Sequence, residues 1–133
     1  MRCLKKILLV DDDDAFRGLL SKLLSTEFEV LESSGVKDAR KKLETTSVDF
    51  ICSDYNMRDG TGLDLLHYCK EMNTSTPFVL MSAYDLDQLS RKAELFGISF
   101  CEKTDGEFLG KLKATLLNAE QSKLDNDSQA LIS

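Results

Sequence analysis

Several residue types that mark specialised proteins are scarce in this 133-residue sequence. Its four cysteines are scattered and form no C-x-x-C pair, which argues against a zinc site or a redox dithiol. Three of them stand in apolar segments, so we expect small core residues in a reducing cytoplasm. The single histidine, His67, falls in a predicted helix and is expected to be an ordinary surface or half-buried residue.

Long hydrophobic runs are also missing. The apolar run near the amino terminus, ILLV, is followed at once by charge, so we expect neither a signal peptide nor a membrane span. The net charge of −6 and the isoelectric point of about 4.8 argue against a nucleic-acid or anionic-membrane partner reached through bulk charge. We therefore expect a cytoplasmic protein that itself binds neither nucleic acid nor a membrane.

What the sequence does contain is a regular alternation of short apolar segments and amphipathic ones. The length fits one domain with a substantial core. Crossovers long enough for a helix predict a parallel sheet that helices cover on both faces, which is an α/β fold. The predicted strands are 6–10, 28–33, 48–53, 77–83 and 98–102, and the predicted helices are 16–24, 36–43, 62–72, 86–96 and 108–117.

Two further expectations concern the arrangement of these segments. The first, third and fourth strands are the most apolar and should be central in the sheet. The chain turns polar near residue 118, so we expect a domain over residues 1–117 and a tail or the start of a linker over residues 118–133.

Charged and polar residues end four of the predicted strands. Ligands of open parallel sheets bind beyond the carboxyl ends of the strands, so these residues are the candidates for chemistry. They are Asp11 and Asp12, Asp54, Ser82 and Lys103. Because neighbouring carboxylates repel one another, this group of acids is tolerable at one edge if a divalent cation neutralises it.

The chemistry of these side chains predicts which cation binds. Carboxylate oxygens favour Mg²⁺, with Mn²⁺ as the alternative, and the lack of cysteine or histidine in the group counts against zinc. The next two acids, Asp13 and Asp14, are expected to begin a solvated helix, with Asp14 as a candidate N-cap.

The ordered motifs LLVDDDD, SDYNMRDGTGLDLL, VLMSAY and FCEKT resemble the receiver domain of bacterial two-component response regulators. The resemblance covers residues 5–117. It implies a flavodoxin-like, doubly wound sheet of five parallel strands in the order 2-1-3-4-5. It also implies that a sensor histidine kinase or a histidine phosphotransfer protein phosphorylates Asp54, and that a downstream protein or a fused output domain responds.

The resemblance also assigns roles to the strand-end acids. Asp54 would be the nucleophile, activated by positioning and by charge neutralisation. Mg²⁺ would be held by Asp12, by Asp54 and by the backbone carbonyl of Asn56, while Asp11 would hold a metal-bound water. The three carboxylates carry −3, and Mg²⁺ with one lysine carries +3, so an added phosphoryl group would make the site negative.

That excess charge predicts a switch. Lys103 would pair with Asp54 and then with a phosphoryl oxygen, and Ser82 would move toward the phosphoryl group. In the family an aromatic residue on the fifth strand then turns inward, and Phe100 stands at that position. The alternative is that Phe100 is a plain core residue. The switch would reshape the surface of the fourth helix, fifth strand and fifth helix for a partner.

The sequence departs from the family pattern at two prolines. Thr104 follows Lys103 where the family usually has proline after a cis bond, so either this bond is trans or it carries strain. Arg58 replaces the proline that usually follows the methionine of the second motif, Met57. Two variable positions, Asn56 and Tyr84, should tune the lifetime of the phosphoryl group, with Tyr84 shielding it from water.

Two other functions stay open at this point. The chain could be a receiver-like interaction module that works without phosphorylation, as Thr104 suggests. It could also be a Mg²⁺-dependent phosphohydrolase with an aspartate nucleophile, although the Asp-x-Asp pattern on the first strand and a cap domain are not evident. As a receiver, it would be no enzyme beyond catalysing its own phosphorylation and dephosphorylation.

Overall fold

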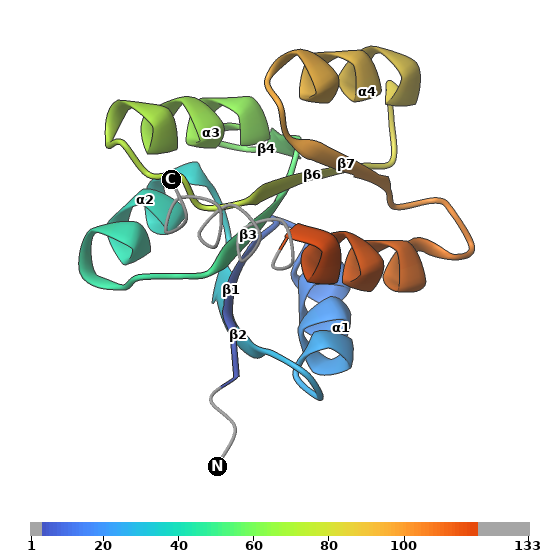
Figure 1. Cartoon of the computed structure of the whole chain (residues 1–133), viewed down its shortest axis with the longest axis horizontal. Coiled ribbons are helices and arrows are strands. Elements are labelled where there is room, and N and C mark those ends of the chain that lie inside the picture. Colours follow the sequence, from blue (N-terminus) through green and yellow to red (C-terminus); the bar gives the residue numbers. More distant parts are fainter. Residues whose placement is uncertain (1–3, 120–133) are drawn as a thin grey trace, which may run out of the picture.

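The computed structural model describes residues 4–119, which form a five-stranded parallel sheet between two layers of helices (Figure 1). The strands lie in the order β2 (Glu29–Ser33), β1 (Lys6–Val10), β3 (Phe50–Asp54), β6 (Phe78–Ser82) and β7 (Ser99–Glu102). This order confirms the predicted 2-1-3-4-5 arrangement, with the three most apolar strands in the centre. The fold is therefore the expected doubly wound α/β fold.

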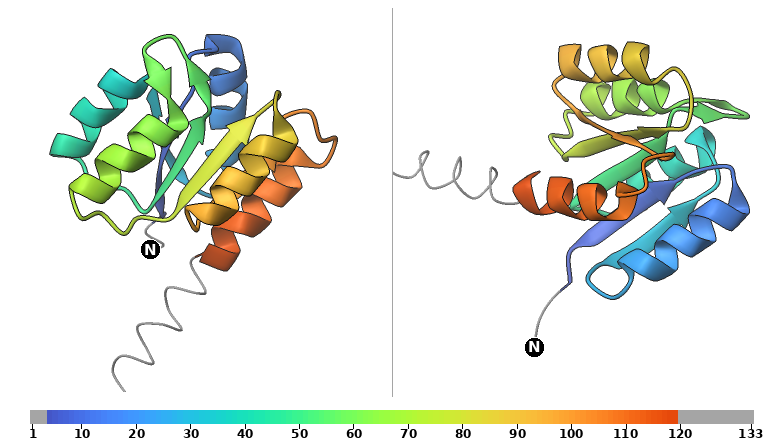
Figure 2. Two further views of the ribbon diagram at one scale, coloured as in Figure 1. Left: turned by 90° about the horizontal axis from the view of Figure 1, so that it is seen from above. Right: turned by 90° about the vertical axis from the view of Figure 1, so that its right-hand side faces the viewer.

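The helices divide unequally between the two faces of the sheet. They are α1 (Asp14–Leu24), α2 (Val36–Thr45), α3 (Gly62–Glu71), α4 (Leu86–Leu95) and a C-terminal helix described over residues 108–119. The α1 helix and the C-terminal helix cover one face, and the other three cover the opposite face (Figures 1 and 2).

The sequence of β1 explains why the sheet is buried on both sides. Successive side chains of a strand point to opposite faces, and Ile7 and Leu9 pack with the core beneath α1. Leu8 and Val10 pack with the core beneath α2 and α3. All four side chains are fully buried, which a strand with alternating polarity could not achieve.

Local hydrogen bonds set where the helices begin. The N-cap of α1 is Asp13, whose carboxylate accepts from the backbone N–H of Phe16, and Asp14 is already helical. The prediction of Asp14 as the N-cap is therefore wrong by one residue. The α3 helix begins with a capping box, in which Thr61 and Asp64 each accept a hydrogen bond from the other's backbone N–H.

A small hairpin after β3 was not expected from the sequence. It pairs β4 (Asn56–Met57) with β5 (Gly60–Thr61) in antiparallel fashion. Gly60 has a φ of 149°, a conformation that residues with a Cβ atom rarely adopt. Strands of two residues are too short to show an alternating pattern, so the sequence carried no signal for them.

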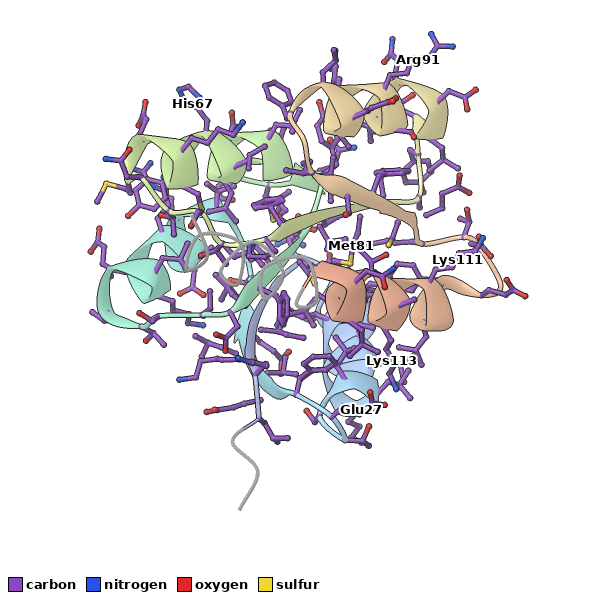
Figure 3. All side chains as sticks on the ribbon, in the orientation of Figure 1. Glu27, His67, Met81, Arg91, Lys111 and Lys113 are labelled. Carbon is purple, nitrogen blue, oxygen red and sulfur yellow. The ribbon has the colours of Figure 1, made fainter. Side chains whose placement is uncertain are left out.

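The remaining expectations concern single side chains. The described cysteines Cys52, Cys69 and Cys101 are buried free thiols, and Cys3 lies outside the described residues. His67 is exposed on α3 and pairs with Glu71 at 3.2 Å (Figure 3).

The predicted domain boundary falls inside the C-terminal helix, which is described as far as residue 119; the predicted tail otherwise lies outside the described residues. None of the helices in residues 4–119 is long and apolar enough to cross a membrane.

Candidate functional site

The first two site residues follow directly on β1. Asp11 is fully buried, and its backbone N–H donates to the carbonyl of Ser33 at 3.0 Å, which extends the pairing with β2 by one residue. Its carboxylate accepts from the N–H of Asp13 at 3.0 Å. Arg17 of α1 donates from Nη1 to the carbonyl of Asp11 at 2.6 Å. Asp11 is therefore held at the sheet edge by its backbone and its side chain.

Asp54 is the last residue of β3 and meets the acid pair across the sheet edge. One carboxylate oxygen from each of Asp11, Asp12 and Asp54 lies within 4.8 Å of the other two. Residues ending neighbouring parallel strands share one edge, which is why acids distant in sequence meet here. The structure therefore brings together the three carboxylates that the sequence analysis selected.

Gly62 lets α3 begin against the end of β3. A Cβ atom at this position would lie 2.6 Å from the carbonyl oxygen of Asp54 and 2.6 Å from Leu80 Cδ1. The N–H of Gly62 donates to the carbonyl of Tyr55 at 2.8 Å. The helix thus begins directly beside the Asp54 backbone, and a larger residue would have to displace it.

Lys103 reaches the acids from the loop after β7. Its Nζ lies 2.6 Å from Asp11 Oδ2 and 3.1 Å from Asp54 Oδ1. The expected pair with Asp54 is present, but the shorter contact is with Asp11, whose full burial leaves its charge unscreened by water. The bond between Lys103 and Thr104 is trans, so the lysine reaches the site without the cis bond usual in the family.

Ser82 ends β6, but its hydroxyl is engaged within its own loop. Ser82 is buried, its Oγ donates to the carbonyl of Tyr84 at 2.8 Å, and it accepts from the N–H of Tyr84 at 3.1 Å. A hydrogen bond from Ser82 to any new group in the site would therefore require this loop to change.

Asp12 is tied to the loop that follows Asp54. Its Oδ2 accepts from the backbone N–H of Arg58 at 3.0 Å. Proline has no backbone N–H, so the residue that departs from the family pattern supplies this hydrogen bond. Asn56, whose carbonyl was predicted to be a ligand, stands on β4 at the start of the same loop and is exposed.

These side chains line one cleft of about 450 Å³ at the carboxyl edge of the sheet. Its lining comprises Asp11, Asp12, Asp13, Phe16, Asp54, Asn56, Ser82, Ala83, Tyr84, Lys103 and Thr104. Every residue predicted for the metal, the phosphoryl group or its lifetime is among them. Tyr84 is 72% exposed at the rim, a position from which it could cover the cleft.

Phe100 does not line this cleft. It is half-buried on β7, opposite Leu80 of β6, and packs against the core beneath α3 and α4. It also lines a separate groove between α4 and the C-terminal helix. Its predicted turn toward the interior stays a prediction, and the side chain stands between the core and this surface.

Burial dominates the electrostatics of Asp54. Desolvation raises the pKa of its carboxyl to about 6, although the Lys103 charge opposes this and the Asp11 charge adds to it. A metal-free Asp54 therefore takes up its proton as the pH falls through about 6, above the range of an ordinary aspartate. Any cation bound by these oxygens would favour the ionised carboxylate.

The donor set fits a hard divalent cation. Carboxylate oxygens are ligands that Mg²⁺ takes in proteins, usually one or two of them together with several waters. The cluster offers three carboxylates, and the open cleft leaves room for the waters. Sulfur and imidazole ligands are absent from the described cluster, which disfavours zinc. The acidic cluster is thus a candidate magnesium site.

The sequence analysis missed three residues around the site. Arg17 holds the Asp11 carbonyl, and the ring of Phe16 lies 4.3 Å from the Lys103 Nζ. Asp59 joins the β4–β5 turn to α2. Phe16 stood only as the first residue of a predicted helix, and Arg17 binds a backbone carbonyl, which carries no sequence signal. Asp59 contacts residues 22 and 23 positions away, too far for a local pattern to reveal.

Comparison with known proteins agrees with this geometry. Residues 7–101 match the family model of the response regulator receiver domain. The chain is 32% identical to the response regulator protein PilR of Pseudomonas aeruginosa, over 92% of this chain but 29% of PilR. It is 30% identical to the transcriptional regulatory protein CpxR of Klebsiella pneumoniae, over 96% of this chain and 56% of CpxR.

A solved structure shows the same fold. A response regulator receiver domain protein from Clostridium thermocellum superimposes with a TM-score of 0.80 at 24% identity, covering 91% of this chain and 98% of that one. The curated relatives are longer, and the chain spans between about a quarter and a little over half of PilR, NtrC and CpxR. The family match covers most of the chain, and this chain therefore belongs to the response regulator receiver domain family.

Proposed function

We propose that this chain is a Mg²⁺-dependent phosphoacceptor that takes a phosphoryl group onto Asp54 and so switches a protein-interaction surface. The observation that carries the proposal is the joint placement of three carboxylates with oxygens within 4.8 Å and an ammonium 3.1 Å from Asp54. A nucleophile, a place for a cation and a fixed positive charge thus meet in one open cleft.

The residues act together on the reacting phosphorus. An Asp54 oxygen forms the new O–P bond as the N–P bond of a phosphohistidine breaks, and the leaving imidazole takes a proton from solvent. Asp12, Asp54 and the Asn56 carbonyl would hold Mg²⁺, which when bound would supply positive charge beside the transferring oxygens. Lys103 shifts from Asp11 and Asp54 to a phosphoryl oxygen, which its flexible stem allows.

The switch follows from the same charges. With the phosphoryl group in place the site becomes negative, and Ser82 leaves the Tyr84 carbonyl to donate to a phosphoryl oxygen. The loop after β6 then moves beside β7, where Phe100 packs. We place the output on the surface of α4, β7 and the C-terminal helix, read by a downstream protein or a fused output domain.

The partners belong to the proposal as well. The phosphodonor is a histidine kinase or a histidine phosphotransfer protein, because the Asp54 carboxylate is a weak nucleophile and needs an activated phosphoryl group. The three buried free thiols suit a reducing cytoplasm. The chain modifies itself rather than turning over a separate substrate, so we do not class it as an enzyme.

Incubation with acetyl phosphate and Mg²⁺, followed by mass measurement of the intact protein, tests the proposal. We expect one added phosphoryl group in the wild type and none in Asp54→Asn or in the presence of EDTA. No adduct, and no binding of beryllofluoride, would support an interaction module that works without phosphorylation. Sustained hydrolysis of a generic phosphoester would instead support a phosphohydrolase.

A further inference from the structure

The turn between β4 and β5 is fastened to the amino terminus of α2. The Asp59 carboxylate accepts from the backbone N–H of Val36 at 2.9 Å and from that of Lys37 at 3.0 Å. These two hydrogen bonds, led by the one from Lys37, hold the pKa of Asp59 below its usual range. The first N–H groups of a helix lack partners within the helix, so Asp59 caps α2 from a distant part of the chain.

The amino terminus of α2 has space for the Asp59 carboxylate because its N-cap residue is a glycine. Its own N-cap residue, Gly35, has no side chain that could accept a hydrogen bond. A Cβ atom on Gly35 would lie 2.7 Å from Asp59 Oδ1, closer than such contacts allow. The constraint is steric, because Gly35 has an extended backbone that any residue could adopt. Gly35 therefore makes room for Asp59.

The same turn is fastened to the candidate site on its other side. Arg58, the neighbour of Asp59, donates its backbone N–H to Asp12 Oδ2 at 3.0 Å. Asn56, two residues before Arg58, lines the cleft and pairs with Thr61 across the hairpin. The hairpin thus connects α2 with Asp12 and with Asn56, whose carbonyl is a ligand in the proposed magnesium site.

We propose that Asp59 is a positioning residue for the cation site, acting through the hairpin rather than by contact with the metal. By fixing the turn on α2, it aims the Arg58 N–H at Asp12 and keeps the Asn56 carbonyl at the cleft. Ligand orientation by surrounding hydrogen bonds strongly affects metal affinity. The inference rests on the proposed function in so far as the cation is Mg²⁺.

Replacement of the carboxylate tests the inference. Asp59→Ala should raise the Mg²⁺ dissociation constant, measured by calorimetry, by about threefold to tenfold, less than loss of a group bonded directly to a ligand. In the metal-free variant, the amides of Val36 and Lys37 should exchange hydrogen faster, and the Arg58 amide resonance should shift. Asp59→Asn keeps one accepting oxygen and should fall between the wild type and Asp59→Ala.

The chain offers a matched control. Asp49 likewise accepts a backbone N–H from a distant residue, that of Lys6 at 2.7 Å, but at the start of β1 and β3, the opposite edge of the sheet. Asp49→Ala should leave Mg²⁺ affinity and the Arg58 resonance unchanged. If Asp59→Ala does not fold, Gly35→Ala displaces the same carboxylate and should weaken Mg²⁺ binding in the same way.

The outcomes separate this inference from the proposed function. An Asp59→Ala protein that loses protection at Val36 and Lys37 but binds Mg²⁺ as tightly as the wild type would overturn the inference alone. A wild type that binds no Mg²⁺ would overturn the proposed function. In that case, the Arg58 amide resonance of Asp59→Ala still tests whether Asp59 positions the turn. A resonance unchanged from the wild type would refute this positioning role.

Discussion

At the scale of single residues, the site buries acidic side chains, and burial disfavours their ionised forms. Asp11 and Asp54 are both buried, and Lys103 places one positive charge between their carboxylates. Desolvation nevertheless raises the pKa of Asp54 to about 6, because one lysine does not offset burial and a neighbouring acid. The metal-free protein therefore carries a residue whose ionisation opposes folding.

The pH dependence of stability should report this opposition. An unfolded aspartate titrates near pH 3.9. Between about pH 4 and pH 6 Asp54 therefore binds more protons in the folded state than in the unfolded state, and its contribution to stability falls as pH rises. In EDTA, Asp54→Asn should therefore raise the free energy of unfolding at pH 7 by about 1–3 kcal/mol. The gain should vanish near pH 4 in denaturant titrations. A gain of equal size at both pH values would contradict this account.

A second residue-scale prediction concerns Tyr84. Its side chain is 72% exposed at the rim of the cleft, where it can screen an aspartyl phosphate from water. Tyr84→Ala should shorten the lifetime of the phosphorylated protein, followed by the decay of its intact mass after the donor is removed. Tyr84→Phe keeps the ring and should decay like the wild type. An equal or longer lifetime for Tyr84→Ala would refute the shielding role.

At the scale of elements, the site depends on where strands end and where helices begin. The acids, the serine and the lysine could be selected from sequence because each follows an apolar strand, and parallel strands bring such ends together. Two contacts near the starts of helices could not be predicted from the sequence. The capping of α2 by Asp59 joins segments 23 residues apart that share no pattern, and the hydrogen bond from Arg17 goes to a backbone carbonyl, which has no sequence signal.

The close start of α3 beside β3 gives an element-scale prediction. Gly62→Ala places a methyl group against the Asp54 carbonyl and should lower the free energy of unfolding by about 1–3 kcal/mol. Gly18 lies in α1 with no atom within 4 Å of an added Cβ. Gly18→Ala should therefore raise stability by about 0.5–1 kcal/mol. Urea titrations showing the two variants to be alike would contradict the steric argument.

At the scale of the whole molecule, the sheet carries both the site and the proposed output surface. Strand order could be predicted because alternating segments permit few parallel arrangements, and the family resemblance selected one. Two features could not be predicted from the sequence: the β4–β5 hairpin and the shorter contact of Lys103 with Asp11. Both depend on packing and charge around the cleft in the folded protein.

Coupling between the site and the output surface is a prediction at this scale. Beryllofluoride with Mg²⁺ imitates the phosphoryl group and should alter hydrogen exchange in α4 and β7, far in sequence from Asp54. Phe100 packs between the core and that surface, so Phe100→Leu should reduce the change without abolishing beryllofluoride binding. If Phe100 is a plain core residue, the variant will respond as fully as the wild type.

The most direct test of the central claim is to locate the phosphoryl group. Borohydride reduces an aspartyl phosphate to homoserine, which peptide mass mapping detects. After treatment with acetyl phosphate and Mg²⁺, we predict homoserine at position 54 and at no other aspartate. Homoserine at Asp11 or Asp12, or none at all in protein shown to bind Mg²⁺, would contradict the account.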